Sequence, residues 1–300
     1  MVGGEDKLVN KKSFGDYVFD IFNYLFLILL SVVCIYPLWY VIVSSFSDGN
    51  SLIMHTGILI KPLDVTVVAY KYVFQDPMIL KSYGNTLFVI VFGLAINITL
   101  TSIAAYVLSR KDVMIANGLM KLIVFTMFFS GGLIPNYIMV KNLHLIDNKF
   151  SLILPTAIVT YNLIILRTNF AAIPDSLEES ARLDGAGDFT ILFKIILPLS
   201  KAALAVMVLY YGVSHWNSWF SAMIYLRSRE KYPLQLILRE ILLDNSTGAM
   251  TGGASVQDNM AVSESIKYAV IVVATLPILC VYPFLQKYFV KGVMIGSVKG

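Results

Sequence analysis

The sequence predicts an all-α protein that crosses a membrane six times. Of its 300 residues, 57% are hydrophobic and only 14% are charged, whereas soluble domains average about 45–50% apolar residues. The mean hydropathy of +0.74 agrees with this composition. Six apolar segments are long enough to cross a hydrocarbon core of about 30 Å as helices. The expected spans are 21–46, 85–108, 122–140, 150–166, 202–226 and 268–286.

The two ends of the chain are expected on one side of the membrane, because the number of spans is even. The first span should not be a cleaved signal, since its apolar run is too long and YPLW at 36–39 replaces the small residues of a cleavage site. A small excess of Lys and Arg on the side of the termini predicts that both termini are cytoplasmic. The resulting division is a tail at 1–16, a transmembrane region at 17–290 with a loop at 167–201, and a tail at 291–300.

The composition argues against several classes of function. No predicted span carries Asp, Glu, Lys or Arg, the residues on which proton and sodium relays depend. The chain has no GxxxxGK[ST] motif to bind a nucleotide, so active transport by this protein would draw its energy from a partner. Its basic residues are spread over loops, which argues against nucleic-acid binding. Cys34 and Cys280 lie in apolar spans and are expected to be small buried residues rather than a disulfide or a metal site.

Proline and glycine predict where the spans bend or begin. Pro135, Pro155 and Pro277 fall at such places, and the pair at 131–132 weakens the third span. Beyond the fifth span, LQLILREILL at 234–243 predicts a short helix. The small polar residues at 245–259 predict a flexible loop after it, on the external side.

The loop between the fourth and fifth spans reads IPDSLEESARLDGAGDFTILFKIILPLS over 173–200. Ser176 and Glu179 fit the S-x-x-E capping box, in which a hydroxyl and a carboxylate satisfy free amides at a helix start. Glu178 lies four residues before Arg182 and can pair with it on the same face. The loop therefore predicts a short, well-formed helix at the membrane surface.

The end of this helix also has local signals. Gly185 supplies the left-handed position at which helices commonly end, and Asp188 is placed to cap a second helix that runs toward Pro198. Asp184 stands in the last turn, where a carboxylate opposes the helix dipole. Small residues would let another protein approach closely, namely Ser180, Ala181, Gly185, Ala186 and Gly187. The alternative is an amphipathic helix lying on lipid, against which its acidic character and its lack of a large apolar face count.

The spacing of these residues resembles a known motif. Glu179-Ser180-Ala181, then Gly185, Ile195 and Leu197-Pro198, are similar to the EAA motif of the permease subunits of binding-protein-dependent ABC importers. Ser180 departs from the Ala usual at its place, a change that keeps the side chain small. The two short helices and the turn between them form an elbow. In such importers this elbow is the coupling helix, which docks in a groove of a cytoplasmic ATPase. The resemblance implies this role for Glu178, Glu179, Ser180, Ala181, Asp184, Gly185 and Ala186.

The resemblance extends over nearly the whole chain to carbohydrate importers of the maltose type, and among them to oligosaccharide permeases. It is carried by FSGGLIPNYIMVKNLHLIDN from 129, YNLIILRTNF from 161, HWNSWFSAMIYL from 215 and YFVKGVMIGSVKG from 288. It implies the type I ABC importer permease fold, a bacterial cell membrane, and a heterodimer with a second homologous permease. The other implied partners are two cytoplasmic ABC ATPase subunits, which bind ATP and Mg²⁺, and an extracytoplasmic solute-binding protein. The chain itself would bind no cofactor and catalyse no reaction.

A sugar is bound by stacking on aromatic rings and by neutral polar groups that meet its hydroxyls. The fourth and fifth spans offer such residues, and Trp216 and Trp219, three apart, are expected on one helix face with Gly212. The alternative for these aromatic residues is a belt at the membrane interface. The candidate substrate path comprises Tyr161, Asn162, Tyr211, His215, Trp216, Asn217 and Trp219.

The C-terminal segment 288–300 has glycine at every fourth place from 292, which disfavours a helix. The resemblance implies that this tail is ordered at the ATPase subunits, with Gly296 and Lys299 as candidate contacts. The alternative is a dispensable, solvated end.

Other functions remain open at this point. One is an amino-acid or peptide permease of the same class, although WNSW at 216–219 and the terminal VKG favour carbohydrate. A second is half of an ion-coupled carrier, against which the uncharged spans argue. A third is an intramembrane enzyme that uses His215, although no Ser or Cys nucleophile with an orienting acid is evident beside it.

Overall fold

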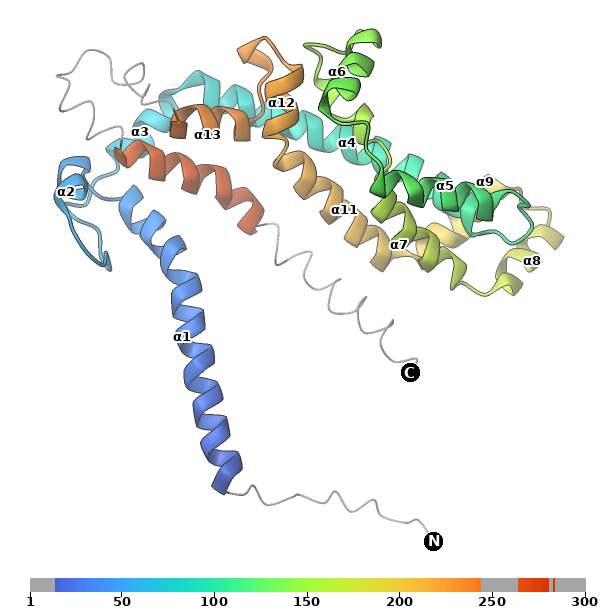
Figure 1. Ribbon diagram of the computed structural model, residues 1–300, viewed down its shortest axis with the longest axis horizontal. Helices are drawn as coiled ribbons and strands as arrows, with labels where there is room; N and C mark the ends of the chain where they lie inside the picture. Colours follow the sequence, from blue (N-terminus) through green and yellow to red (C-terminus); the bar gives the residue numbers. More distant parts are fainter. Residues whose placement is uncertain (1–13, 244–263, 281–282, 284–300) are drawn as a thin grey trace. The chain divides into compact units, whose positions relative to one another are not determined.

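The computed structural model describes residues 14–243, 264–280 and 283, and every regular element among them is a helix. These residues fall into two units, one made of 14–70 and 264–272, the other of 71–243, 273–280 and 283. Figure 1 shows the helices of both. The predicted all-α class is confirmed.

The first unit is organised around α1 (Phe14–Ser45), an apolar helix of 32 residues. The short helix α2 (Gly49–Met54) follows, with Asp48 at its N-cap accepting from the amides of Asn50 and Ser51. The first stretch of the unit ends in the first residues of α3 (Val68–Gln75), and the helical residues 264–272 also belong to it. A small core near the end of α1 contains Val43, Leu52 and Leu59, with Tyr40, Leu63 and Tyr268 packed against it. Most of α1 exposes its apolar side chains.

The second unit is built on α4 (Pro77–Ser109), a helix of 33 residues. Pro77 suits the first helical position, and Asp76 accepts a hydrogen bond from the amide of Met78 at 2.8 Å. Along its length α4 packs against α7 (Thr160–Ala171) and α11 (Lys201–Trp216), and near its start against α13 (Leu234–Leu243). The other helices are α5 (Ala116–Phe128), α6 (Leu133–Asn142), α8 (Asp175–Leu183), α9 (Asp188–Ile191), α10 (Leu197–Leu199) and α12 (Trp219–Tyr225). Four short helical turns complete the unit: η1 (Lys149–Leu152), η2 (Leu154–Thr156), η3 (Leu192–Ile196) and η4 (Arg229–Lys231).

By length and composition, the helices α1 and α4 could cross a membrane unbroken, and they contain most of the spans predicted at 21–46 and 85–108. The next three predicted spans correspond to bent pairs. α5 meets α6 at 117°, η1–η2 meets α7 at 51°, and the run from α9 to α10 meets α11 at 86°. The described residues thus hold two candidate spans, or up to five if each bent pair is one. The sixth predicted span is helical up to residue 280, and most of its remainder lies outside the described residues.

The bends predicted near 131–132 and Pro155 are confirmed. Gly132 has a φ of +87° between α5 and α6, a conformation that glycine adopts without strain, and Pro155 lies in the turn η2. The short helix predicted at 234–243 is confirmed as α13. The expectation that Cys34 and Cys280 are buried is wrong, because both lie on exposed faces of their helices.

A continuous helix over 202–226 is also a wrong prediction, since α11 ends at Trp216 and α12 begins at Trp219. The hydroxyl of Ser218 donates to the carbonyl of His215 at 2.7 Å. The amide of Ser218 also donates to that carbonyl, at 3.3 Å, so one residue closes the turn after α11 with two bonds.

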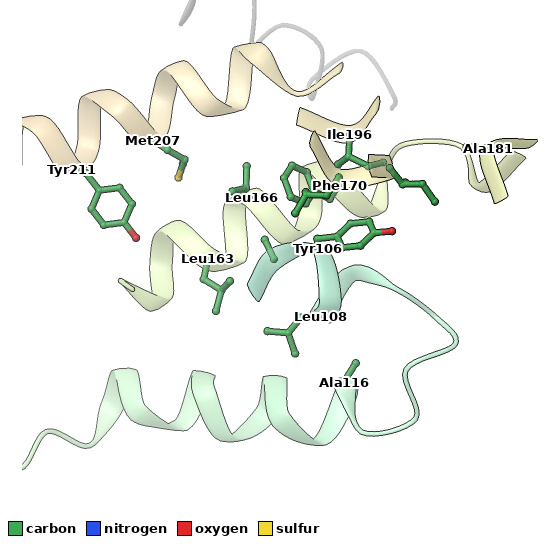
Figure 2. Packing of buried hydrophobic residues seen from close by; sticks show 13 residues of the cluster. Tyr106, Leu108, Ala116, Leu163, Leu166, Phe170, Ala181, Ile196, Met207 and Tyr211 are labelled. Carbon is green, nitrogen blue, oxygen red and sulfur yellow. The ribbon is translucent and has the colours of Figure 1, made fainter. Parts of the chain in front are cut away.

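A large apolar core lies where α4 ends, between α7, α11 and the segment that follows α7 (Figure 2). Phe170 of α7 and Met207 of α11 are fully buried there. Burying a side chain of this size contributes about 1.5–3 kcal/mol. Ala181 of α8 and Ile191 of α9 belong to the same core, so the loop after the fourth predicted span is packed onto the helices rather than detached from them.

Near the start of α4, one carboxylate joins two loops. Asp147 accepts hydrogen bonds from the amide of Ser228 at 2.9 Å, from its hydroxyl at 2.7 Å and from Nζ of Lys231 at 2.7 Å. The hydrogen bond from Lys231 holds the pKa of Asp147 well below its usual range. Asn85 of α4 donates to the carbonyl of Glu230 at 2.8 Å. The loop after α12 is thereby fixed to this end of the helix.

Candidate functional site

The predicted elbow is formed by α8 and α9, which are joined by the turn 184–187. Gly185 has the left-handed conformation that the sequence predicts, with a φ of +83°. Its amide donates to the carbonyl of Arg182 at 3.0 Å, and the amide of Ala186 donates to that of Ala181 at 2.9 Å. These two bonds form a Schellman motif, which ends α8 and turns the chain directly into α9.

Both predicted side-chain caps are wrong. α8 begins at Asp175, so Ser176 lies inside its first turn rather than at the N-cap. Asp188 is the first residue of α9 rather than the residue before it. The two aspartates bind cations of neighbouring elements instead: Asp175 accepts from Lys111 at 2.7 Å and Asp188 from Arg182 at 2.8 Å. Neither helix start has a side-chain cap, and the aspartate at the start of each helix forms an ion pair.

The second elbow helix continues toward Pro198, as predicted. It passes from α9 into η3, a π-helical segment at Leu192–Ile196, before α10. π-helical turns inside α-helices occur frequently at functional sites. Ile195 of the motif-like spacing lies in this segment and packs against the core.

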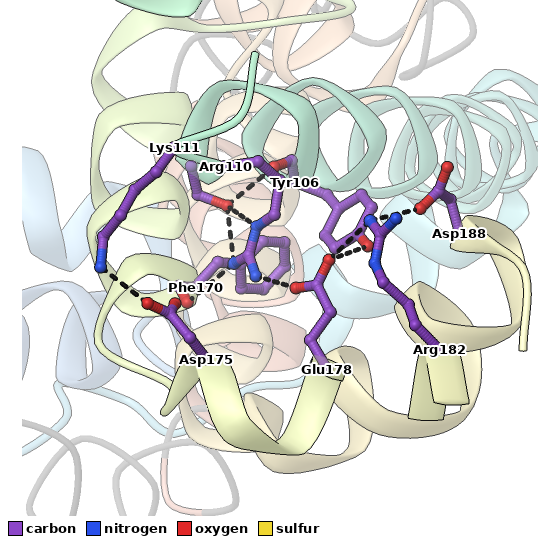
Figure 3. Close-up of polar contacts among 9 residues, drawn as sticks. Tyr106, Arg110, Lys111, Phe170, Asp175, Glu178, Arg182 and Asp188 are labelled. Carbon is purple, nitrogen blue, oxygen red and sulfur yellow. Dashed lines mark hydrogen bonds and ion pairs between the residues drawn. The ribbon is translucent and has the colours of Figure 1, made fainter. Parts of the chain in front are cut away.

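Glu178 is buried at the inner face of α8, as Figure 3 shows. Its carboxylate accepts hydrogen bonds from Arg110, from the hydroxyl of Tyr106 at 3.0 Å and from Arg182 at 3.0 Å. The i, i+4 pairing with Arg182 is the one that the sequence predicts. Only 9% of the Glu178 side chain and 10% of the Arg110 side chain are exposed. A buried pair of this kind is stable only if its remaining polar atoms are also bonded.

Arg110 follows the last residue of α4 and contacts two other helices. Besides Glu178, its guanidinium donates to the carbonyl of Phe170 near the end of α7 at 3.1 Å. Arg167 of α7 forms a bond in the opposite direction, from Nε to the carbonyl of Leu108 at 2.7 Å. The ends of α4 and α7 are therefore tied to each other and to α8.

Two further ion pairs lie nearer the surface. The side chains of Lys111 and Asp175 are 84% and 56% exposed, and Arg182 and Asp188 are also exposed. Exposed pairs contribute only about 0.2–1 kcal/mol each. The pair of Arg182 and Asp188 links α8 to α9, and that of Lys111 and Asp175 links α8 to the chain just after α4.

The ion pairs and hydrogen bonds of Glu178 shift the pKa values of Glu178 and Arg182. Burial alone would raise the pKa of Glu178, but the hydrogen bonds from Arg182 and Tyr106 and the charge of Arg110 outweigh burial and hold that pKa below its usual value. The hydrogen bond to Glu178 in turn raises the pKa of Arg182. Glu178 is therefore a carboxylate at neutral pH, and its negative charge is shared between two guanidinium groups.

The outer face of the elbow carries most of the motif-like residues. Those exposed are Glu179, Ser180, Asp184 and Gly185. Ala181 is buried in the core and Ala186 is partly buried. Two large apolar side chains also point outward, because Leu183 is 89% and Phe189 is 71% exposed. Exposed apolar groups beside small and polar residues are typical of a surface that meets another molecule.

Sequence reasoning misses Tyr106, Arg110 and Arg167. Their partners in this cluster lie 72, 68 and 59 residues away along the chain, so no local spacing connects them. The one local signal is SRKD at 109–112, directly after an apolar helix. A guanidinium there indicates a contact with a carboxylate but does not identify which one.

Within the bundle, His215 and Asn97 support the break in the fourth predicted span. Asn97 of α4 donates its two amide hydrogens to the carbonyls of Thr156 at 2.7 Å and Ala157 at 2.9 Å. Its oxygen is left to accept from Nε2 of His215 at 2.7 Å. Backbone groups freed inside a membrane need such partners. His215 therefore holds the side chain of Asn97 in the orientation in which it pairs the carbonyls of Thr156 and Ala157.

Tyr211 supports the same break. Its hydroxyl accepts from the amide of Val159 at 3.1 Å and shares a hydrogen bond with Thr101 at 2.7 Å. Asn162 is buried in α7, whereas Tyr161 beside it is exposed. The predicted path residues on α7 and α11 are thus divided between the interior of the bundle and its surface.

The remaining path residues lie around the break between α11 and α12. The prediction that Trp216 and Trp219 share a helix face is wrong, because the chain turns between them. Trp216 is buried, and its indole N–H has no hydrogen-bond partner among the described residues. The ring of Trp219 lies 4.7 Å from a guanidinium of α13, and Asn217 is exposed in the turn. Gly296, Lys299 and the loop at 245–259 lie outside the described residues.

Known proteins resemble this chain over almost its entire length. The polygalacturonan/rhamnogalacturonan transport system permease protein YtcP of Bacillus subtilis is 46% identical, over 94% of this chain and 99% of YtcP. Protein LplC of the same organism is 44% identical, over 94% and 95% of the two chains. A solved bacterial ABC transporter involved in the import of the acidic polysaccharide alginate matches with a TM-score of 0.85 and 34% identity, over 93% of this chain and 99% of that chain. No protein-family model matches the sequence.

Proposed function

The chain belongs to the maltose-type carbohydrate permease family of ABC importers, and from this premise we propose that it is one of two homologous permease subunits that together form the translocation path for an oligosaccharide. The observation that carries the proposal is the elbow. Its inner face is fixed to the bundle through Glu178, while its outer face presents Glu179, Gly185, Leu183 and Phe189. A helix held on one face and free on the other is suited to receive force from a partner.

The partner at this outer face would be an ATPase subunit. Leu183 and Phe189 are suited to an apolar groove, and the small residues around Gly185 allow close approach. Lipid is the less suitable occupant, because Glu179 and Asp184 are exposed on the same face and an anionic membrane surface repels carboxylates. Two such ATPase subunits would bind ATP and Mg²⁺, and this chain would bind no cofactor and catalyse no reaction.

The proposed topology has six spans in a bacterial cell membrane, with both termini and the elbow in the cytoplasm. Each bent pair then forms one span, and the helix at 264–280 begins the sixth. The tail at 291–300 would reach the ATPase subunits through Gly296 and Lys299. The opposite end of α4, with the loops joined by Asp147, would face the external solute-binding protein.

The proposed substrate class rests on the relatives and on one side chain. YtcP is named for polygalacturonan and rhamnogalacturonan, and the relative AraQ of Bacillus subtilis, 27% identical, for arabinooligosaccharides. Trp216 is buried, but its indole N–H has no partner among the described residues, so among the seven path candidates it is the donor that a sugar hydroxyl would meet when the bundle opens. An amino acid would instead require charged partners for its ammonium and carboxylate groups, and the predicted spans carry none.

The proposal is tested with the purified complex of both permeases, the ATPase and the binding protein in liposomes. We expect oligosaccharides, supplied as a neutral maltooligosaccharide set and an acidic oligogalacturonate set, to stimulate ATP hydrolysis. Amino acids and short peptides should not. Stimulation by peptides alone would identify the chain as a permease of the peptide class and contradict the proposal.

A further inference from the structure

We propose that Arg110 and Glu178 form the joint that makes the elbow and α4 move as one body, so that these two residues position the coupling surface without contacting the ATPase. This inference rests on the proposed function, since a joint for coupling presupposes an ATPase at the elbow. It assigns different roles to two adjacent acids, Glu178 and Glu179, which the sequence alone places together in the coupling surface.

The two acids differ in burial, because consecutive residues of a helix project about 100° apart. Glu178 is buried and its carboxylate is surrounded by donors from α4 and α8, whereas Glu179 is exposed on the outer face. An ATPase that docks on the outer face can contact Glu179. Glu178 offers it little surface, since only 9% of that side chain is exposed and its carboxylate is bonded to Arg110.

The chain itself connects the elbow to α4 only indirectly. Arg110 and Glu178 are separated by 68 residues, and α8 is reached from α7 through the short link 172–174 and left through the turn 184–187. A push on α8 would bend these links unless α8 were attached directly to the long helix. The contacts of Arg110 with Glu178 and with Phe170 attach it to α4 and to the end of α7 at one point.

The joint is completed by Tyr106 and Arg182. Tyr106, one helical turn before Arg110 on α4, donates to Oε1 of Glu178 at 3.0 Å. Arg182 donates to Oε1 of Glu178 at 3.0 Å and to Asp188 at 2.8 Å, so the second elbow helix is included. Three elements, α4, α8 and α9, thus meet at one buried carboxylate (Figure 3).

The protein contains a matched control for this joint. Lys111 and Asp175 also join the end of α4 to α8, at 2.7 Å, but their side chains are 84% and 56% exposed. Water and salt screen such a pair and make it weak. If any ion pair between these elements served equally well, removing this pair would have the same effect as removing the buried one.

The experiment compares Glu178→Gln and Arg110→Gln with Asp175→Asn in the reconstituted complex, measuring the ATPase bound per permease and the ATP hydrolysis stimulated by oligosaccharide. We expect Glu178→Gln and Arg110→Gln to retain the bound ATPase while stimulation falls roughly tenfold, a size typical of coupling between sites. Asp175→Asn should remain within about twofold of the unmodified protein, as expected for an exposed pair.

The double variant Arg110→Gln with Glu178→Gln separates coupling from simple stability. It leaves no unpaired buried charge, so its thermal stability should recover relative to the single variants. Stimulation should stay low, because the charged joint is still missing. The same double variant carries the test if a single variant does not accumulate in the membrane.

Three results would overturn the proposal. Full stimulation in Glu178→Gln or in the double variant would show that the pair does not couple. Loss of bound ATPase in Glu178→Gln would place Glu178 in the docking surface itself. An equal loss of stimulation in Asp175→Asn would show that the buried pair has no special role. Failure of the proposed function is distinct from all three, because the unmodified complex would then show no stimulation by oligosaccharides.

Discussion

Gly93 of α4 is the residue on which the ring of His215 lies. A Cβ built at Gly93 would lie 2.4 Å from Nε2 and 2.7 Å from Cδ2 of that ring. His215 cannot simply move away, because the same Nε2 is bonded to Asn97, whose amide holds the broken fourth span. Because Gly93 has no side chain, α11 can pack closely against α4. The ring of His215 then reaches Asn97, which bonds the break before α7.

We expect Gly93→Ala to destabilise the permease by about 1–3 kcal/mol, as overpacking of a well-packed site does. The matched control is Gly84→Ala on the same helix, where none of the described atoms lies within 4 Å of an added Cβ. There, the greater helix propensity of alanine should leave stability unchanged or raise it by up to about 1 kcal/mol. Thermal unfolding of the two variants in detergent measures the difference, and equal stabilities would show that His215 does not pack against Gly93.

The same scale shows what a sequence can and cannot reveal. The left-handed Gly185 and the pairing of Glu178 with Arg182 are predicted correctly because each depends on residues at most four positions apart. The pairing of Glu178 with Arg110 depends on how α4 and α8 pack, and no pattern within α8 contains that information. The capping box of Ser176 and Glu179 fails because α8 begins earlier, at Asp175, with Pro174 at the N-cap.

Among the elements, α8 owes its sharp end to the Schellman motif at Gly185. A residue with a Cβ at a φ of +83° costs roughly 1–2 kcal/mol, and a β-branched residue is the least tolerant of that conformation. A side chain there would reorient the turn 184–187, and with it the exposed Leu183 and Phe189. The geometry of the outer face therefore depends on one backbone position.

We expect Gly185→Val to reduce the amount of ATPase that co-purifies with the permease by several-fold or more. Gly185→Asn is the matched control, because asparagine tolerates the left-handed conformation, and it should retain most of the ATPase. Membrane levels of the two variants, measured by immunoblot, confirm that both are inserted. Normal co-purification with Gly185→Val would contradict the importance of this turn for docking.

The breaks in the spans are also decided at the scale of elements. Glycine and proline identify the bends at 131–132 and 155, because these residues change the backbone locally. Between α11 and α12 the chain breaks at Asn217 and Ser218 without either residue type. At that break, His215 is bonded to Asn97 of another helix, and its carbonyl accepts from the hydroxyl of Ser218. A hydropathy pattern over 202–226 cannot distinguish it from a continuous helix.

At the scale of the whole molecule, the helix α4 holds the loops at one end of the second unit and the elbow at the other. Asp147 and Asn85 fix the loops near the start of α4, and Arg110 fixes the elbow after its last residue. An α-helix of 33 residues spans about 50 Å at 1.5 Å per residue, enough to cross a membrane. One continuous helix thus connects the proposed ATPase side to the proposed side of the binding protein.

The central claim is that an ATPase docks on the outer face of the elbow while the inner face stays bound to α4. Single cysteines placed on α8 test it most directly, in a background carrying Cys34→Ala and Cys280→Ala, with a short cross-linker that joins a thiol to a lysine amine and the intact complex. Glu179→Cys and Leu183→Cys replace exposed residues and should cross-link to the ATPase subunit. Ala181→Cys replaces a residue buried against the core and should not. Cross-linking at position 181 equal to that at 183, or none at any of the three positions, would contradict the account.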